Sequence, residues 1–421
     1  MPVSISQVTS TLQKVIMPYI QDNLPSQTIL LDKIRGNSDV QVMNDNFYAP
    51  IRTSRHGGIV ALASDTSNTR SGQSSRSQAS VGVKILTGQF EITKLAIDAT
   101  RSNQLAVENE LMEQADTLVR DFSRDVNRQL YGDGYGIIGQ VLGSIGAGTM
   151  AVGVVTSSVD DARGTADYFG SINGDIAPGQ YIYPGMVLGI GTGGADAGTV
   201  TSITRAAGSA TVVMTGAPAI VADDAVYTLD GSEAGAGTSE LTGITSALSF
   251  NASGTYAGIA RTASELWQPQ TDSTLEALTL SRMQRKYLAA RQYGANSDTY
   301  IILVNQALYS KYGDLLTAMR RTVNEMELAG GWTGLSFEVG AGKVGVFLDY
   351  QVPDGEVLIL NLDTWKLCQV SDINWMENPT GDGGSLLRVV NSIKYQATMH
   401  WFVNLLNVAP AANARLAKKQ G

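Results

Sequence analysis

The most regular hydrophobic pattern in the chain lies between about residues 102 and 131. Apolar residues recur there at spacings of three or four, which places them on one face of a helix: Leu111, Ala115, Leu118, Phe122, Val126 and Leu130. About thirty residues at 1.5 Å per residue give a helix of roughly 45 Å. Glycines at 132, 134 and 136 follow, and glycine readily adopts the left-handed conformation at which many helices end. We call this predicted element the spine helix.

Charged residues divide the spine helix into two halves. Acidic residues occupy the N-terminal half and basic residues the C-terminal half, as the helix dipole favours: Glu108, Glu110, Glu113 and Asp116, then Arg120, Arg124 and Arg128. The spacing of Asp116 and Arg120 also predicts an i,i+4 ion pair. We interpret these charges as a solvated or intersubunit face and not as a catalytic set.

Two segments before the helix are predicted to be extended, at residues 48–62 and 81–97. The sequence between them, "ASDTSNTRSGQSSRSQAS", is small and polar and cannot bury a core. Composition alone favours a flexible surface loop. The alternative is a long two-stranded arm whose tip becomes ordered on a neighbouring subunit. About 15 residues of strand would reach roughly 50 Å, and an isolated ribbon is marginally stable in water, so such an arm would need a partner.

The region from 137 to 260 has a different texture. Short β-branched runs such as "GTVTSIT" and "SATVVMT" are separated by Gly, Pro, Asp and Ser, which predicts a small antiparallel barrel or sandwich. Ten acidic and two basic residues give the region a formal charge of −8. "GIGTGG" at 189–194 fits a dinucleotide-binding pattern, but a predicted strand follows where that site needs a helix N-terminus. We therefore interpret it as a β-turn.

The remaining sequence alternates helical and extended patterns. Helical spacing predicts one helix with Leu280, Met283 and Tyr287 that stops near Gly294, and a second with Leu308, Tyr312, Leu315 and Met319. The apolar run "TYIILV" at 299–304 lies between them as a predicted buried strand. Four further strands are predicted after residue 334. In the last of these, alternate residues share one face: Tyr395, Ala397, Met399, Trp401, Val403 and Leu405. This order indicates an α+β domain.

Composition narrows the classes of function. The chain has 421 residues, is 43% hydrophobic and 16% charged, and carries a formal net charge of −9, so it is a folded protein that repels nucleic acid at long range. The single cysteine, Cys368, excludes an intrachain disulfide framework and a cysteine zinc site. Neither an export signal nor a membrane span is predicted. Near the N-terminus, a short amphipathic arm is indicated by the spacing of Val8, Leu12, Val15 and Ile16.

Candidate chemistry is sparse. The two histidines, His56 and His400, belong to separate predicted strands and lack metal-ligand spacing. The adjacent acidic pairs at 160–161 and 223–224 suggest at most a weak cation site, because no oxygen-ligand loop of the EF-hand kind surrounds them. We expect no catalytic, cofactor-binding or metal-binding residues, and hence no enzyme.

The order of the segments resembles the tailed-bacteriophage major capsid protein, the Hong Kong phage-type fold that encapsulins share. The strongest local similarity is "FEITKLAIDATRSNQLAVENELMEQADTLVRDFSRDVNRQLYGDG", which looks like the family's extended loop running into its spine helix. "ELAGGWTGLSFEVGAGKVGVFLDYQVPDGEVLILNLDTWKL" and "WMENPTGDGGSLLRVVNSIKYQATMHWFVNLLNVAPAANARL" look like its later strands. Together these segments cover somewhat over half of the chain. The acidic β-rich region has no counterpart in the minimal fold and looks like an inserted domain.

The resemblance implies an α+β capsid subunit with six parts: an N-terminal arm at 1–47, an extended loop at 48–98, the spine helix at 99–136, a β-rich insertion with flanking strands at 137–260, an axial α/β domain at 261–380, and C-terminal strands at 381–421. It also implies candidate intersubunit contacts by basic residues in the loop and on the helix: Arg52, Arg55, Arg70, Arg76, Lys84, Arg120, Arg124 and Arg128. Some capsids of this fold cross-link a lysine to an asparagine. Lys84 lies in the corresponding loop, without an identifiable partner.

The implied partners are copies of the same chain, arranged as pentamers and hexamers of an icosahedral shell. Such a shell would enclose double-stranded DNA without sequence preference, would assemble in the host bacterial cytoplasm without a membrane, and would become the virion capsid. Scaffold, portal and decoration proteins are further candidate partners. Two alternatives stay open: an encapsulin-like compartment that holds an enzyme cargo, and a soluble α+β enzyme with a β-rich accessory domain.

Overall fold

The computed structural model describes eighteen segments of the chain: residues 29–35, 41–43, 45–54, 56–59, 72–95, 104–146, 148–153, 181–190, 196–206, 209–216, 225–228, 240–294, 299–318, 325–328, 332–339, 342–377, 386–389 and 392–420. None of the helices in these segments is long and apolar enough to cross a membrane.

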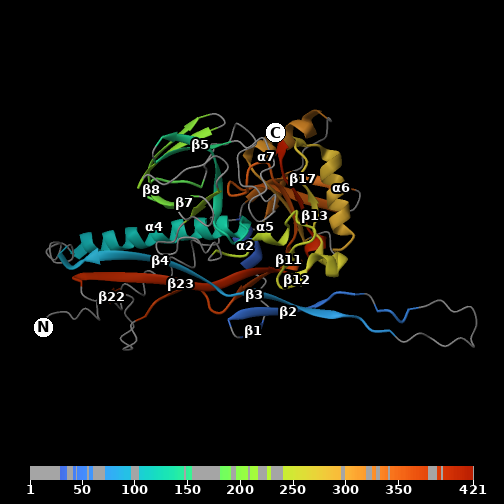
Figure 1. The fold of residues 1–421 in the computed structure, drawn as a ribbon, viewed down its shortest axis with the longest axis horizontal. Helices are drawn as coiled ribbons and strands as arrows, with labels where there is room; N and C mark the ends of the chain where they lie inside the picture. The colour runs from blue at the N-terminus through green and yellow to red at the C-terminus, as the bar shows by residue number, and fades with distance from the viewer. Residues whose placement is uncertain are drawn as a thin grey trace, which may run out of the picture.

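The spine helix is α4 (Gln104–Tyr131), and it runs along the molecule beside two long strands, as Figure 1 shows. Its apolar stripe is buried in the main core at Ala115, Val119, Phe122, Val126 and Leu130, which confirms the predicted amphipathic helix. Exposed polar residues such as Arg120 and Arg124 lie off this stripe, whereas the last turns of the helix also bury Asn127 and Gln129.

The two long strands belong to a sheet centred on β23 (Lys394–Asn407). Strand β4 (Lys84–Thr93) pairs antiparallel along one edge of β23. Three short strands pair with the other edge: β20 (Trp365–Gln369), β21 (Asn374–Trp375) and β22 (Leu386–Arg388). We call these five strands the long sheet.

One face of the long sheet packs in the core with α4. Ala397, Met399, Trp401, Val403 and Leu405 are buried, and Tyr395 at the strand end is half-buried, so the predicted alternation along this strand is confirmed. The helix packs close to the sheet at Gly88. A Cβ there would lie 3.2 Å from Leu118 Cδ1, so a larger residue would push the helix away from the sheet.

The extended loop begins as a three-stranded antiparallel sheet of β1 (Gln41–Met43), β2 (Asn46–Arg52) and β3 (Arg76–Gly82). The β2–β3 ladder runs from Asn46 opposite Gly82 to Arg52 opposite Arg76, and the ribbon projects beyond the body of the molecule (Figure 1). These paired strands support the two-stranded arm at its base; residues 60–71 of the polar stretch lie outside the described residues. We call β2, β3 and the chain between them the extended arm.

The pairing within the arm differs from the expectation that 48–62 and 81–97 would form the ribbon. Only 76–82 pairs with the first strand, whereas β4 leaves the arm and pairs with β23. The reason is burial: Ala79 and Val81 of β3 pack in the main core, and Leu86 of β4 does so from the long sheet. The segment that was expected to be one arm strand is therefore two strands in two sheets.

The β-rich insertion is a closed barrel, in the order β10-β5-β6-β9-β8-β7, with every neighbouring pair antiparallel. Of the two predicted forms, the barrel is confirmed. The strands are β5 (Ile137–Gly146), β6 (Thr149–Gly153), β7 (Val187–Ile190), β8 (Asp196–Ala206), β9 (Ser209–Thr215) and β10 (Ala225–Thr228). The barrel has its own hydrophobic core, which includes Val141, Leu188 and Val212.

The barrel occupies the first part of the region 137–260, for which an insertion with flanking strands was predicted. Its last strand ends at Thr228, and residues 240–260 form α5 (Ile244–Ala247), β11 (Thr255–Tyr256) and β12 (Ile259–Ala260). Leu241, Ile244 and Tyr256 from this stretch are buried in the main core beside α4. The chain thus leaves the main body after α4 and has returned to it by Glu240. In Figure 1 the barrel stands on α4.

The domain predicted at 261–380 is built on a seven-stranded mixed sheet in the order β13-β24-β19-β15-β18-β17-β16. Its strands are β13 (Gln270–Asp272), β15 (Tyr300–Val304), β16 (Glu325–Leu328), β17 (Trp332–Val339), β18 (Gly342–Leu348), β19 (Val357–Asn361) and β24 (Ala414–Leu416). The last strand comes from the C-terminal segment, so the end of the chain completes this sheet. We call this part the central domain.

Two helices pack on the central sheet, α6 (Leu280–Arg291) and α7 (Gln306–Ala318). Met283, Tyr287, Leu308 and Tyr312 are buried in its core, and every residue of β15 is buried, which confirms the predicted helix, strand, helix order. In α7 the third buried position is Leu316 and not the expected Leu315, which is half-buried; residue 319 lies outside the described residues.

Candidate intersubunit surfaces and the barrel joint

Two of the predicted contact residues lie on the extended arm. Arg52 and Arg76 form the last pair of the β2–β3 ladder, and both side chains are exposed. The Nε of Arg52 donates to the carbonyl oxygen of Ser54 at 3.0 Å. Arg55 and Arg70 lie outside the described residues. The structure therefore puts two exposed cations together where the ribbon leaves the body.

Lys84 lies at the start of β4, opposite Val403 of β23. It is half-buried, and desolvation lowers the pKa of its ammonium below the ordinary value. Lys84 thus belongs to the long sheet and not to the projecting ribbon, because the chain has already left the arm at Gly82.

Arg120 and Arg124 are exposed on the middle of α4. The predicted i,i+4 pair is present, with Arg120 Nη2 lying 2.6 Å from Asp116 Oδ2. The Arg120 side chain is 55% exposed, so water screens this pair and it contributes little to the stability of the subunit.

Arg128 does not face outward as predicted. It lies one turn from the end of α4, and its side chain is 10% exposed. Its guanidinium donates two hydrogen bonds to the Glu240 carboxylate, from Nη1 to Oε2 at 3.2 Å and from Nη2 to Oε1 at 2.5 Å. Its Nε also donates to Asp125 Oδ1 at 2.8 Å. Burial alone would lower the Arg128 pKa, but the Glu240 and Asp125 charges outweigh it and raise the pKa. The partner of Arg128 is within its own chain.

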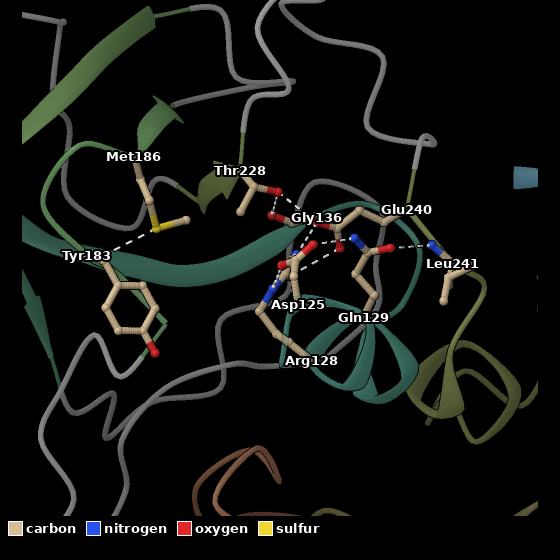
Figure 2. A network of polar contacts seen from close by, with 9 residues as sticks. All are labelled: Asp125, Arg128, Gln129, Gly136, Tyr183, Met186, Thr228, Glu240 and Leu241. Carbon is tan, nitrogen blue, oxygen red and sulfur yellow. Dashed lines mark hydrogen bonds and ion pairs between the residues drawn. The ribbon is translucent and has the colours of Figure 1, made fainter. Parts of the chain in front are cut away.

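The Arg128–Glu240 pair is the centre of a network shown in Figure 2. Gln129 Nε2 donates to Asp125 Oδ2 at 2.7 Å, and its Oε1 accepts the Leu241 N–H at 3.3 Å. On the barrel side, Thr228 Oγ1 donates to Glu240 Oε1 at 2.7 Å. We call Asp125, Arg128, Gln129, Thr228 and Glu240 the barrel joint.

The barrel joint holds both ends of the inserted domain. Thr228, the last residue of β10, donates its N–H to the carbonyl oxygen of Gly136, just before β5, at 2.9 Å. Gly136 has φ +70°, and a Cβ there would lie 2.9 Å from Thr228 Oγ1 and 3.3 Å from Glu240. Only glycine combines that backbone conformation with the close approach. The outgoing and returning chains are therefore fixed beside the last turns of α4.

A second buried network connects α4 to the central domain and the barrel. Asp349, directly after β18, accepts the Tyr131 hydroxyl at 2.7 Å and Asn127 Nδ2 at 3.3 Å. The Tyr181 hydroxyl of the barrel donates to the Gln351 carbonyl oxygen at 2.7 Å. Burial, and then the Asp349 charge, raise the pKa of Tyr131 well above its ordinary value. The Asp349 carboxylate thus joins α4 to the central domain, and the barrel contacts the same loop at Gln351.

Sequence reasoning did not find Glu240 or Asp349. Glu240 is 112 residues from Arg128, and Asp349 is 218 residues from Tyr131. The one available local signal was the i,i+3 spacing of Asp125 and Arg128, which predicts a pair on α4 but not its burial. Long-range partners of this kind depend on how the chain returns after the insertion.

No cluster of potential metal ligands occurs among the residues that the structure describes. His400 packs against Phe402, with ring centroids 5.3 Å apart, and His56 Nδ1 accepts the Gly58 N–H at 3.1 Å. The sequence after "GIGTGG" is strand β8, paired antiparallel with β7, and not a helix. The acidic pairs at 160–161 and 223–224 lie outside the described residues.

Comparison with known proteins identifies the fold of this chain through solved structures. No family model matches the sequence, and no curated protein matches it. Among solved structures, the capsid asymmetric unit of cyanophage A-1(L) matches with a TM-score of 0.51 at 14% identity, over 94% of both chains. The Gordonia phage Cozz structure has a TM-score of 0.43 at 10% identity, covering 93% of this chain and 86% of the other. The holo-SrpI encapsulin complex from Synechococcus elongatus PCC 7942 has a TM-score of 0.41 at 9% identity, covering 92% and 86%.

The chain therefore has the fold of a phage capsid subunit. The predicted fold class, a phage major capsid fold with an arm, a spine helix and a β-rich insertion, is confirmed. The match extends over 94% of both chains.

Proposed function

We propose that this protein is the major structural subunit of an icosahedral shell that encloses the double-stranded DNA of a tailed phage. The observation that carries the proposal is the match of nearly the whole chain to a cyanophage capsid subunit. In this proposal the subunits assemble as pentamers and hexamers in the host cytoplasm, and the protein performs no catalytic step. Scaffold, portal and decoration proteins are candidate partners.

The proposal is supported by the position of the exposed cations. Arg52 and Arg76 are paired on a ribbon that projects from the body, and Arg120 and Arg124 are exposed on α4. Each exposed ion pair with a neighbour would contribute only ~0 to 1 kcal/mol, so a shell needs many such contacts together with buried apolar area.

Net charge supports a shell that surrounds DNA without clamping it. The formal charge is −9, of which the region 137–260 carries −8. An acidic wall repels phosphate at long range, and packaged DNA must move in and out. We place the barrel on the outer surface of the shell, where its acidic residues are solvated and distant from DNA.

Microscopy tests the shell directly. We expect the purified chain to form capsomers or closed shells in negative-stain images, with matching particle sizes by light scattering. Nuclease-protected DNA inside the particles would identify a phage capsid, whereas an enclosed enzyme would identify an encapsulin-like compartment. Monomers alone, over a range of salt concentrations and with a scaffold supplied, would contradict the proposal.

A deletion within the extended arm tests its role in assembly. Ala79 is fully buried, so a deletion should end before β3; residues 60–71 are the appropriate segment. We expect that deletion to leave the subunit folded, by circular dichroism, and to abolish shell formation. A chain with residues 60–71 in scrambled order is the control for length. Normal assembly of the deletion variant would refute a bridging role for the arm.

The position of the barrel can be tested with intact particles. We expect proteases and antibodies to reach residues 180–230 before any disruption of the shell. Access that appears only after disruption would place the barrel inside.

A further inference from the structure

The long sheet has a second face, opposite the one that packs with α4. Strand registers place its side chains in rows across the sheet. Ile85 of β4 is opposite Phe402 of β23, and Val370, just after β20, donates its N–H to the Phe402 carbonyl oxygen at 3.0 Å. Because neighbouring Val403 points into the core, these three side chains lie on the outer face.

Two further rows continue this face along β23. Thr87 and Asn374 are both in register with His400, and Gln89 is in register with Thr398, to which the Met376 N–H is bonded at 2.7 Å. We call the resulting surface the outer face; its nine residues are Ile85, Thr87, Gln89, Val370, Asn374, Met376, Thr398, His400 and Phe402.

The outer face is apolar in part and carries no formally charged residue. Ile85 is 60% exposed, Val370 53% and Met376 48%. The acidic residues Asp372, between Val370 and Asn374, and Glu377, after Met376, are exposed next to this face, and the exposed ion pair of Glu91 with Lys394 lies beyond the third row. Without cations the face has no means of holding phosphate, so nucleic acid is a poor occupant. A grouped set of exposed apolar side chains is typical of a surface that another segment covers.

The N-terminal segment of this chain has matching chemistry. Residues 1–21 contain one charged side chain, Lys14, and an apolar stripe at Val8, Leu12, Val15 and Ile16. An uncharged amphipathic segment loses little electrostatic solvation when it covers an uncharged face, whereas a charged one would bury unpaired charges.

The chain that joins the N-terminal segment to the body is long enough to reach the outer face. Residue 29 begins helix α2 (Ile29–Arg35), whose Leu30 and Leu31 are buried and which contacts β20, an edge neighbour of the outer face. Twelve residues lie between Ile16 and Ile29, and at ~3.3 Å each they can span roughly 40 Å. The sheet from β20 to β4 is only about two strand spacings wide, near 10 Å. The tether can therefore pass around the sheet edge.

We propose that residues 8–16 dock through their apolar stripe onto the outer face of the long sheet in the same subunit. The docked segment covers Ile85, Val370 and Phe402 and shields His400, which lies in the adjacent row. The inference does not depend on shell formation.

Histidine labelling tests the docking with a built-in control, because the chain has two histidines and His56 is exposed on the extended arm. The reagent is diethyl pyrocarbonate, and modification of each histidine is followed by mass spectrometry on the unassembled full chain. The test variant is Leu12→Asp with Ile16→Asp. The matched control is Ser6→Asp with Ser10→Asp, which adds the same charges on the opposite helical face at the same spacing.

We expect His400 of the Leu12→Asp/Ile16→Asp variant to react roughly fivefold faster with the reagent, because the docked segment no longer covers the imidazole. His56 should react at the same rate in all three proteins, and the Ser6→Asp/Ser10→Asp control should match the unmodified chain at His400. Equal His400 rates in both variants would overturn the proposal.

Photo-cross-linking identifies the occupant independently of any change in folding. A benzophenone amino acid at position 370 should cross-link to residues 4–20 within a species that migrates as a monomer on a denaturing gel. The same amino acid at Tyr350, which is 69% exposed in the central domain, is the control and should not reach that segment. Cross-links from position 370 only to a second copy, to another protein, or to no peptide would each overturn the proposal.

Discussion

The barrel joint and the extended arm use the same type of residue in opposite ways. In the joint, the side chains of Arg128 and Glu240 are 10% and 5% exposed and meet within one subunit. In the arm, Arg52 and Arg76 are exposed at the last pair of the β2–β3 ladder. Burial explains why these arginines behave differently. A buried charge must be paired within its own subunit, because an unpaired charge out of water is costly, whereas an exposed charge is solvated and can pair later with another subunit.

This comparison suggests how one subunit can be rigid in one place and adaptable in another. The joint fixes where the barrel stands on α4, through contacts between residues far apart in sequence. In the described part of the arm, Ala79 and Val81 of β3 are buried in the main core and hold its base. Variants in the joint should therefore alter folding, and variants of the exposed cations should leave folding nearly unchanged.

The largest effect on stability is expected for Glu240→Ala. Removing this carboxylate leaves the Arg128 charge buried beside Asp125 alone, and breaking a buried pair in this way costs about 3 to 5 kcal/mol. The measurement is urea unfolding followed by circular dichroism. Glu91→Ala is the matched control, because its pair with Lys394 is exposed and is expected to contribute ~0 to 1 kcal/mol. Equal losses in the two variants would remove the distinction between joint and surface.

A smaller loss is expected for Asp349→Ala. The Tyr131 hydroxyl and Asn127 amide would lose a buried acceptor, at a cost of about 1 to 3 kcal/mol. The exposed residue Asp314 on α7 provides the control, and Asp314→Ala should change stability by no more than about 0.5 kcal/mol. If Asp349→Ala unfolds at the same urea concentration as the unmodified chain, this carboxylate does not hold α4 on the central domain.

A further test uses pH. Because the pKa of Tyr131 is raised in the folded state, its stabilising contribution is fully present below the unfolded pKa near 10 and is lost as pH rises through the folded pKa. We expect Tyr131→Phe to lose about 1 kcal/mol at pH 7 and to show a shallower decline in stability above pH ~10. Part of the decline should remain, since burial raises the pKa of Tyr300 to about 12. Tyr183→Phe, at an exposed barrel position, is the control and should keep the original slope.

The smallest effect is expected for Arg120→Ala. Its pair with Asp116 is exposed and lies along one helix, so its loss should cost about 0.3 to 0.5 kcal/mol. Thermal unfolding monitored by circular dichroism is the measurement. A loss comparable with that of Glu240→Ala would show that the middle of α4 is as dependent on ion pairs as its end.

Most of the secondary structure could be predicted because its causes are local. The stripe from Ala115 to Leu130 defined α4, and alternation from Ala397 to Leu405 defined the buried face of β23. A barrel was one of two predicted forms for the insertion, since short β-branched runs with turn residues identify strands but not how they close. The pairing of β4 with β23 was missed because the two segments are about 300 residues apart.

From the sequence, the candidate contact residues could be chosen only because they are basic and lie in the predicted loop or helix. Their burial could not be predicted. Arg120 and Arg128 have the same identity and the same helical setting, eight residues apart, and both follow an acidic residue by one turn. The structure separates them, because the chain returns from the barrel at Glu240 and covers the end of α4 but not its middle.

The sequence by itself determined the spine helix, the strands, the acidic insertion and the glycines at which the chain leaves α4. These follow from periodicity and backbone freedom, which act over a few residues. Only the tertiary structure decided which strands pair, where the barrel stands, and that Arg128 is bound within the subunit while Arg120 is exposed. Those features depend on the burial of side chains by segments more than a hundred residues away, and burial sets the free energy of a charge.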